Sequence, residues 1–304
     1  YLIMKNIIAL DIGGTSIKSG IVKSNGKFYK NSCKVIKIDS TKDKEYIINK
    51  FTSPIKKSIN LLNKTNKDFE GIAISICHPF NFRKGISLIQ NLDKYESIYG
   101  LNIKKIIQKK FSLSVNKPII FNHDAQCYGI GEVLSNDYKK YKKVIVLTIG
   151  TGIGSSFFNN QKIVLKGKGV PHFGWISGQK FKRSILNDYT SSVFMQKQYK
   201  KMTKETISIK TMAERAKNKD EVASKIFCKM GDTLGFYLKK NFINDFNAEC
   251  IIFGGQISLS SDLFINRIKY HLKNCKNLKK ITRAKNIKFA GLKGAAHLLI
   301  NNYE

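Results

Sequence analysis

The chain lacks several features that would place it outside the class of globular proteins with reduced thiols. No apolar run reaches the ~18–20 residues of a membrane-spanning helix, and the N-terminal segment has no long apolar region followed by a cleavage site, as a signal peptide would. The six cysteines form no C-x-x-C pair, which argues against zinc-ribbon and redox motifs. Only four prolines are present, so no Pro-rich linker is expected. We therefore expect a cytoplasmic protein without a membrane anchor.

Acidic residues are scarce as well. The chain has 21 Asp and Glu against 54 Lys and Arg, a formal net charge of +33. Such an excess is typical of proteins that bind polyanions. Only five of the cations are arginine, however, and arginine is the residue that reads phosphates and base edges through paired hydrogen bonds. A compositional drift toward Lys, Asn and Ile is the simpler explanation. We expect no specific nucleic-acid partner, and inorganic polyphosphate remains a possible one.

The length of 304 residues suggests two domains. Short apolar runs alternate with segments of helical periodicity, which predicts an α/β fold whose sheets are covered by helices. We expect strands over 6–11, 16–23, 27–38, 71–77, 118–121, 143–149, 155–158, 250–253 and 286–292. We expect helices over 44–64, 102–111, 124–134, 186–201, 208–217, 219–242 and 261–273, with a last helix from about residue 294.

Three of the predicted strands end in glycine-bearing turns, at residues 11–15, 150–154 and 254–255. Glycine lets backbone N–H groups approach a phosphate without interference from a Cβ atom. Thr15 and Thr151 add hydroxyl donors, and Asp11 would suit a Mg²⁺ ion held between protein and nucleotide. One such turn is weak evidence, because most are strand ends or hairpins. Three in one chain favour phosphate binding, through Gly13, Gly14, Thr15, Gly150, Thr151, Gly152, Gly254 and Gly255.

None of these turns matches a Walker A loop or a dinucleotide-binding fingerprint. We therefore expect the phosphates to lie between two lobes rather than on one helix N-terminus. Asp124 starts a predicted helix directly after a buried strand. It is either a first-turn carboxylate that the helix dipole favours or a general base for phosphoryl transfer to a hydroxyl.

The motifs together resemble those of the ROK family (repressors, uncharacterised proteins and sugar kinases), which belongs to the actin/hexokinase/Hsp70-like superfamily. The segment Leu10–Lys18 is similar to the first phosphate motif, and Asn122–Gln126 is similar to the family's E-N-D-A-N segment. The segment Leu147–Gly154 resembles the second phosphate motif, and Ile252–Gly255 resembles the adenosine motif. Gly294-Ala-Ala matches the closing helix, so the resemblance covers nearly the whole chain.

This resemblance implies a two-lobed actin-like ATPase fold, also described as ribonuclease H-like, with a nucleotide and sugar cleft between the lobes. The N-terminal lobe would comprise 1–117 plus 293–304, and the C-terminal lobe 118–292. It also implies ATP and Mg²⁺ as cofactors, a nucleotide contact from Lys18, and Asp124 as the catalytic base. Closure of the lobes would exclude water from the reaction. Similar proteins are usually dimers, so we expect a homodimer.

The chain departs from the family mainly in the sugar-binding residues. The G-E-x-G-H segment corresponds to Pro171–Trp175, so that His172 and Trp175 replace its Glu and His. A later sugar-contacting Glu corresponds to Asn187, and the Asn beside the base corresponds to His123. The zinc loop is absent, and we predict no zinc. Candidate substrate contacts are His78, Asn91, His123, His172, Trp175 and Asn187.

Three functions follow from these patterns. The first is an ATP-dependent kinase of a sugar or sugar-like acceptor, and the second is the same reaction with polyphosphate as the donor. The third is a sugar sensor or degenerate kinase that binds without transfer, because four sugar-contact positions are altered. A single histidine is more often structural than functional. His78, His123 and His172, however, all correspond to sugar-contact positions of the family. They lack the fixed spacing of a metal site. Trp175 could stack on a sugar or fill the space of the lost zinc loop.

Overall fold

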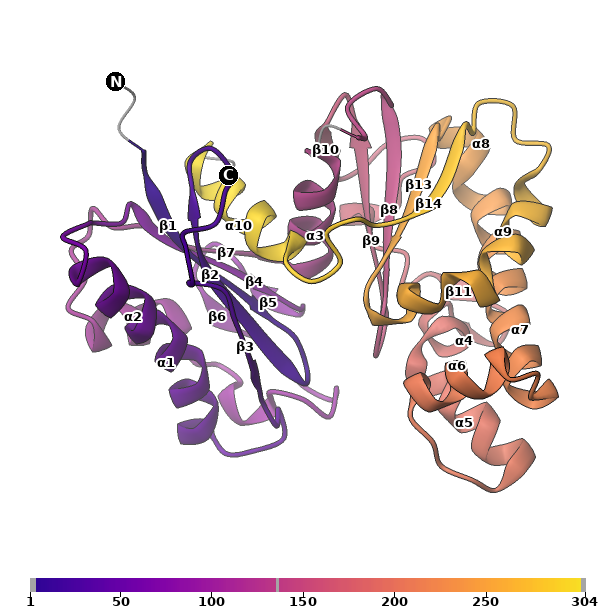
Figure 1. Ribbon diagram of the computed structural model, residues 1–304, viewed down its shortest axis with the longest axis horizontal. Coiled ribbons are helices and arrows are strands. Elements are labelled where there is room, and N and C mark those ends of the chain that lie inside the picture. Colours follow the sequence, from indigo (N-terminus) through magenta and orange to yellow (C-terminus); the bar gives the residue numbers. More distant parts are fainter. Residues whose placement is uncertain (1–3, 135–136, 302–304) are drawn as a thin grey trace. The chain divides into compact units, whose positions relative to one another are not determined.

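The computed structural model describes residues 4–134 and 137–301, and these fold into two compact units. Unit 1 consists of residues 1–131 and 289–304, and unit 2 consists of residues 132–288. Each unit is built around its own five-stranded mixed sheet (Figure 1). The chain therefore leaves unit 1 after Gly131 and returns to it at Phe289.

The sheet of unit 1 has the strand order β3-β2-β1-β4-β7. β1 pairs antiparallel with β2, and β2 with β3, whereas β1, β4 and β7 run parallel to one another. Figure 1 shows α1 and α2 on one face of this sheet and α10 on the other. The bounds are β1 Asn6–Ile12, β2 Ser16–Lys23, β3 Lys34–Lys37, α1 Lys44–Asn63, β4 Gly71–Ile76, β5 Phe80–Asn81, β6 Ile86–Ser87, η1 Glu96–Ile98, α2 Ile103–Lys110, β7 Ile119–His123, α3 Asp124–Val133 and α10 Ala290–Ile300.

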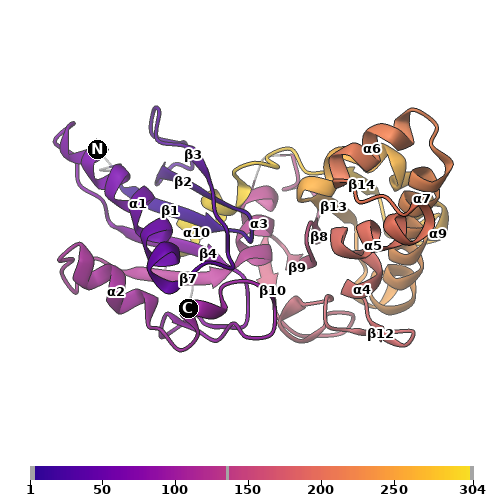
Figure 2. The ribbon, with the colours of Figure 1, turned by 90° about the horizontal axis from the view of Figure 1, so that it is seen from below.

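The sheet of unit 2 has the order β10-β9-β8-β13-β14 and repeats the same pattern of strand directions, with two antiparallel pairs followed by two parallel ones. Its larger helices gather beside this sheet, as the second view also shows (Figure 2). The bounds are β8 Lys143–Ile149, β9 Ile153–Asn159, β10 Lys162–Val164, η2 His172–Gly174, β11 Lys180–Phe181, β12 Ser184–Ile185, α4 Asn187–Thr190, α5 Ser192–Thr203, α6 Ile209–Lys217, α7 Glu221–Leu238, η3 Lys239–Ile243, α8 Asn244–Phe246, β13 Cys250–Gly254, η4 Gln256–Leu263, α9 Ile265–Leu272 and β14 Lys280–Arg283.

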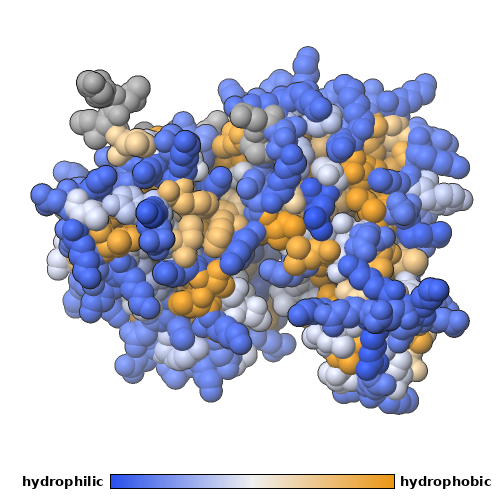
Figure 3. Space-filling model, in the orientation of Figure 1, coloured by the Kyte–Doolittle hydropathy of each residue, from blue (hydrophilic) through white to orange (hydrophobic). Residues whose placement is uncertain are grey.

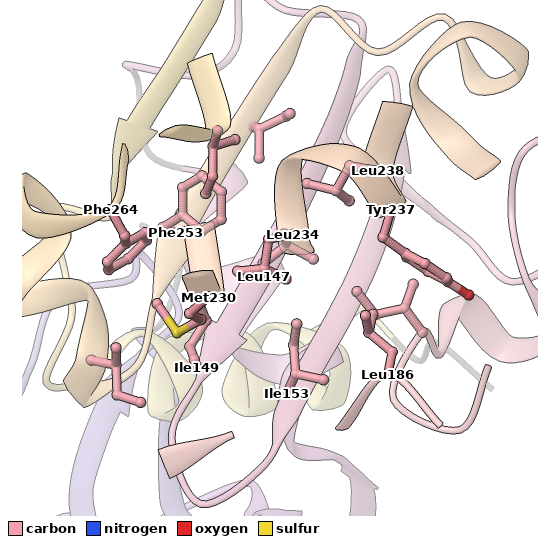
Figure 4. Packing of buried hydrophobic residues seen from close by; sticks show 14 of the residues in the cluster. Leu147, Ile149, Ile153, Leu186, Met230, Leu234, Tyr237, Leu238, Phe253 and Phe264 are labelled. Atoms are coloured by element: carbon pink, nitrogen blue, oxygen red, sulfur yellow. The ribbon is translucent and has the colours of Figure 1, made fainter. Parts of the chain in front are cut away.

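The core of unit 2 forms where α7 packs onto the sheet (Figure 4). Met230, Leu234 and Leu238 recur at a spacing of four residues along α7, which places them on one side of the helix. They meet Leu147 of β8 and Phe253 of β13, and all five side chains are at most 1% exposed. Burial of a side chain of this size stabilises a fold by about 1.5–3 kcal/mol, so this contact holds the strands that carry the second and third glycine turns.

The outer surface is polar, as the composition predicts. On the face drawn in Figure 3, hydrophilic residues cover most of each unit and apolar residues are scattered among them. Within the described part of the chain, no helix combines the length and the hydropathy that a bilayer span requires.

The division of the chain differs from the one expected. We placed the boundaries at 117/118 and 292/293, but they fall after Gly131 and before Phe289. The reason is strand pairing: β7 joins β4 in the first sheet with Ile72 opposite Ile119, so β7 and Asp124 belong to unit 1. The start of α10 also packs on this sheet.

Two expected strands are also corrected. The strand at 286–292 is wrong, because β14 lies earlier and residues 290–292 begin α10. The backbone N–H groups of Lys285 and Asn286 donate to the buried Glu132 carboxylate, at 3.1 and 2.5 Å, rather than to a neighbouring strand. Of the strand at 27–38, only Lys34–Lys37 pairs as a ladder, because Asn31 has a positive φ that interrupts an extended run.

Candidate active site

The candidate site in unit 1 is formed where its three parallel strands end. Ile12 of β1 lies opposite Ile76 of β4, and Ile76 lies opposite His123 of β7. Because parallel strands in register finish at the same edge of a sheet, the residues that follow them become neighbours. The first glycine turn, Cys77 and Asp124 therefore share one edge.

The first glycine turn joins β1 to β2 and is held from two sides. The Gly13 N–H donates to the Ser16 carbonyl at 3.0 Å, which closes the turn. The hydroxyl of Tyr95 donates to the Gly13 carbonyl at 2.5 Å, and Tyr95 itself is fully buried. Gly14 is half-buried and Thr15 is exposed at the tip. The turn is thus a rigid feature of unit 1.

Asp11 lies just below this turn in a network of polar contacts. Its Oδ2 accepts from Lys18 Nζ at 2.9 Å, and its Oδ1 accepts from the Ser75 hydroxyl at 2.9 Å. Gly291 of α10 lies so close that a Cβ there would be 2.9 Å from the Asp11 carboxyl carbon. Only glycine leaves room for the carboxylate at this position. Lys18, assigned to the nucleotide by resemblance, is therefore the ion-pair partner of Asp11 in this structure.

A Mg²⁺ ion in a protein takes oxygen ligands in an octahedral arrangement. Among residues 4–134 and 137–301, no three His, Cys, Asp or Glu side chains gather into a metal cage. A single carboxylate is nevertheless what Mg²⁺ uses beside nucleotide phosphates, since the ion keeps several waters and takes its other ligands from the substrate. Asp11, beside the glycine turn, fits that mode.

Asp124 begins α3 immediately after β7. Its Oδ1 accepts from the Ala125 N–H at 2.7 Å and lies 3.4 Å from His123 Nε2. The side chain is 41% exposed. The carboxylate therefore does stabilise the first turn of the helix, as the structural interpretation predicts, and it still reaches solvent at the edge where the glycine turn lies.

Two histidines stand behind Asp124. His78 Nδ1 is 3.0 Å from His123 Nε2, and the His123 side chain is only 5% exposed. Burial away from water lowers the pKa of His123 to about 4, against the opposing effect of the Asp124 carboxylate. Burial also lowers the pKa of His78. Both rings are thus neutral near pH 7. A neutral His123 with its proton on Nε2 donates toward both Asp124 and His78.

The second and third glycine turns lie together in unit 2. The second turn follows β8, and the Gly150 N–H donates to the Gly152 carbonyl at 2.9 Å. β13 runs parallel to β8, with Gly254 opposite Thr148. Gly255 has φ +81°, and a Cβ there would lie 2.4 Å from the Ile149 carbonyl oxygen. This close approach requires glycine and brings the two turns side by side.

The remaining predicted contacts occupy different places. Asn187 Oδ1 accepts from the Ile153 N–H at 3.0 Å, so this side chain supports the second turn. His172 and Trp175 flank Phe173 on a short turn of unit 2, with ring centroids 4.1 and 5.0 Å from the Phe173 ring. Asn91 is exposed in unit 1 and has φ 57°. Of the predicted substrate contacts in the described part of unit 1, His78 and His123 lie beside Asp124.

Four residues at the unit 1 site escaped the sequence analysis: Ser75, Lys94, Tyr95 and Gly291. Ser75 is the register partner of Asp11, a relation that becomes visible only when β1 and β4 are paired. Lys94 and Tyr95 follow the predicted contact Asn91 by a few residues, but no local pattern sets them apart from other residues of a Lys-rich chain. Gly291 lies three residues before Gly294. Its importance becomes visible only in the structure, where it packs against the Asp11 carboxylate.

Comparison with known proteins identifies the fold. A beta-glucoside kinase of Listeria innocua is 27% identical over 281 residues, covering 88% of this chain and 87% of that protein. The crystal structure of a ROK hexokinase from Thermus thermophilus matches with a TM-score of 0.74 at 16% identity, covering 98% of this chain and 99% of the other. The fold is therefore the α/β, two-lobed actin-like ATPase fold.

A ROK family glucokinase from Streptomyces griseus, solved in complex with glucose and AMPPNP, matches with a TM-score of 0.74 at 20% identity. The match covers 96% of this chain and 98% of that one. The family model described as ROK matches residues 7–302, nearly the full length. Taken with the glycine turns and the strand-end carboxylate, this match shows that the chain belongs to the ROK family.

Proposed function

We propose that the protein is a sugar kinase that transfers a phosphoryl group from ATP, with Mg²⁺, to a hydroxyl of a sugar or sugar-like acceptor. The observation that carries this proposal is the register of unit 1, in which the first glycine turn and Asp124 follow β1 and β7, the parallel strands on either side of β4, at one edge of the sheet. A base and a phosphate-binding turn must both lie within reach of one acceptor, so that its hydroxyl can meet the transferred group. The kinase names of full-length relatives support the reaction class.

In this proposal Asp124 is the general base. The acceptor oxygen attacks the γ-phosphorus, the bond from that phosphorus to the bridging oxygen breaks, and ADP leaves with the electron pair. The proton of the acceptor hydroxyl passes to the Asp124 carboxylate. Since both protein contacts that the structure gives to this carboxylate fall on Oδ1, we assign the proton transfer to Oδ2.

The buried His123 then acts as a positioning residue rather than a sugar contact. Its ring is almost fully enclosed and faces Asp124 and His78. A neutral donor at this place orients the carboxylate and leaves it ionised and ready to accept a proton.

Each unit contributes its own phosphate-binding residues. In unit 1 the Gly13 N–H is already used within the turn, so we assign phosphate contacts to the N–H groups of Gly14 and Thr15. In unit 2 we assign them to the turn around Thr151 and Gly152, and the adenosine contact to Gly254 and Gly255. Asp11 would hold Mg²⁺ through its water shell, and the ion would neutralise charge on the phosphates.

The test is Asp124→Asn, assayed with a panel of sugars by coupled ADP release. We expect kcat to fall by about 10³-fold, as removal of a general base does, while nucleotide affinity is retained. Asp68→Asn, which removes an exposed carboxylate remote from this edge, is the matched control and should keep full activity. Retained turnover in Asp124→Asn would refute the role of the base.

The same panel addresses the donor and the non-catalytic alternative. Polyphosphate replaces ATP in a parallel series at increasing salt, because the charge of +33 should strengthen polyanion binding at low ionic strength. Activity with ATP alone would dismiss the polyphosphate donor. Nucleotide binding without turnover on any acceptor would favour a sensor and contradict the kinase assignment.

A further inference from the structure

Lys94 of unit 1 has no part in the proposed reaction. Lys94 belongs to a segment that we call the Lys94 loop, residues 91–96. The side chain is half-buried, although most lysines of this chain lie on the surface. A Cβ at Gly14 would lie 3.9 Å from Lys94 Cδ, so the lysine stem runs alongside the first glycine turn.

The other end of Lys94 lies near Cys77, the residue that follows β4. Burial raises the pKa of the Cys77 thiol, and the positive charge of Lys94 opposes this rise. Its positive charge also acts on His78 and His123, the two rings behind Asp124. Lys94 thus extends from the phosphate turn after β1 toward the end of β4, the strand that lies between β1 and β7.

The charge of Lys94 is not neutralised in a close ion pair. Lys18, which follows the same glycine turn in β2, pairs instead with Asp11 at 2.9 Å. Among the ion pairs of the described residues, none involves Lys94. A half-buried ammonium without a carboxylate within contact distance is poised to attract an anion.

The Lys94 loop is held in an unusual conformation. Asn91, Asp93 and Tyr95 all have left-handed φ values of 52–57°, which bulky residues such as tyrosine rarely adopt. The Glu96 carboxylate accepts from the N–H groups of Leu92 and Asp93 at 2.9 and 3.1 Å. Such conformations persist only where surrounding contacts impose them, and they are frequent at ligand-binding segments.

Tyr95 connects this loop directly to the phosphate turn. Besides its bond to Gly13, its N–H donates to the Ser40 carbonyl at 2.6 Å, and its ring packs edge-on against Phe51. The buried tyrosine therefore fixes where the preceding lysine stands. Lys94 is placed by a rigid support, which is the condition for an electrostatic contribution to a transition state.

From this geometry we infer that Lys94 is a further catalytic residue, whose ammonium binds the oxygens of the phosphoryl group as it moves from ATP to the acceptor beside Asp124. The inference rests on the proposed kinase function. Those oxygens carry negative charge throughout the transfer, and a cation fixed beside the phosphate turn stabilises that charge in the transition state.

The experiment compares Lys94→Gln and Lys94→Arg with wild type in steady-state kinetics. We expect Lys94→Gln to lower kcat by about 10²-fold with the acceptor KM changed less than about 3-fold, and Lys94→Arg to recover part of the rate. Lys110→Gln removes the same charge from the exposed end of α2 and should behave as wild type. An unchanged kcat overturns the inference. A rise in acceptor KM alone also overturns it, because it would place the lysine on the acceptor.

A second measurement separates this inference from the kinase proposal. Titration calorimetry gives the affinities of wild type and Lys94→Gln for ADP and for AMPPNP, both with Mg²⁺. We expect a loss of about 10-fold for AMPPNP and none for ADP, since only AMPPNP carries a γ-phosphoryl group. Equal affinities in the two proteins would overturn the role of Lys94. If wild type turns over no acceptor, the kinase proposal fails, and the calorimetry still decides whether Lys94 contacts the γ-phosphoryl group.

Discussion

The buried histidine beside Asp124 should make the stability of unit 1 depend on pH. The pKa of His123 is lowered from 6.5 to about 4, mainly by burial. The unfolded chain therefore binds a proton more readily than the folded one between these values. By linkage, the contribution is fully present above about pH 6.5 and is lost as the pH falls toward 4. A shift of this size corresponds to about 3 kcal/mol.

The perturbation is His123→Asn, which keeps a polar side chain but removes the titration. Between about pH 7 and pH 4.5, wild type should lose more stability than the variant by about 2 kcal/mol, since the titration is incomplete at the lower value. Among the neighbouring charges, Asp124 opposes the lowering of the His123 pKa, whereas His78 and Lys94 reinforce it. Asp68, whose pKa is lowered by its bond to Lys117, titrates at lower pH, outside this window.

The assay must report on unit 1 alone. The only tryptophan, Trp175, lies in unit 2, so its fluorescence serves as an internal reference. Hydrogen exchange of peptides covering β4 and β7 measures the opening free energy of the sheet that carries His123. His172→Asn, at an exposed position of unit 2, is the matched control. If wild type and His123→Asn lose equal stability on acidification, or if the His123 ring titrates near pH 6.5 by NMR, the reasoning is refuted.

Two further predictions concern the turns of unit 2. Gly255→Ala should destabilise unit 2 by about 3 kcal/mol or more, because the Cβ would overlap the Ile149 carbonyl and the residue has φ +81°. Chemical denaturation followed by Trp175 fluorescence measures this loss of stability. A loss below about 1 kcal/mol would contradict the prediction. Asn187→Ala removes the acceptor of the Ile153 N–H, which should cost about 1–2 kcal/mol and weaken nucleotide binding several-fold in calorimetry. A rise in acceptor KM with unchanged nucleotide affinity would instead make Asn187 a sugar contact.

Much of the local structure could be predicted from the chain. The helix expected at 44–64 is observed at Lys44–Asn63, and the strands at 16–23 and 143–149 match the observed bounds. These elements have long runs of consistent periodicity, and α1 is capped by Asp43, whose side chain accepts from the Tyr46 N–H. The helix expected over 261–273 is instead a 3₁₀ segment and a separate α9, because backbone at Ser260 and Phe264 departs from helical values.

The membership of Asp124 in unit 1 could not be predicted in this way. It depends on β7 pairing with β4, across more than 40 residues of chain, and no local pattern records which strands become neighbours. The same holds for Asn187, which looks like a substrate contact by position and supports a turn in the structure.

The sequence by itself determined where the glycine turns lie, because a glycine turn after a buried strand is a local property that neighbouring residues specify. It also determined that a carboxylate stands at a strand-to-helix junction. Only the tertiary structure decided which side chains lie around these groups: Ser75 and Gly291 around Asp11, His123 behind Asp124, and Lys94 beside the first glycine turn. Those relations arise from the register of parallel strands and from close packing of α10, and both join residues that are far apart along the chain.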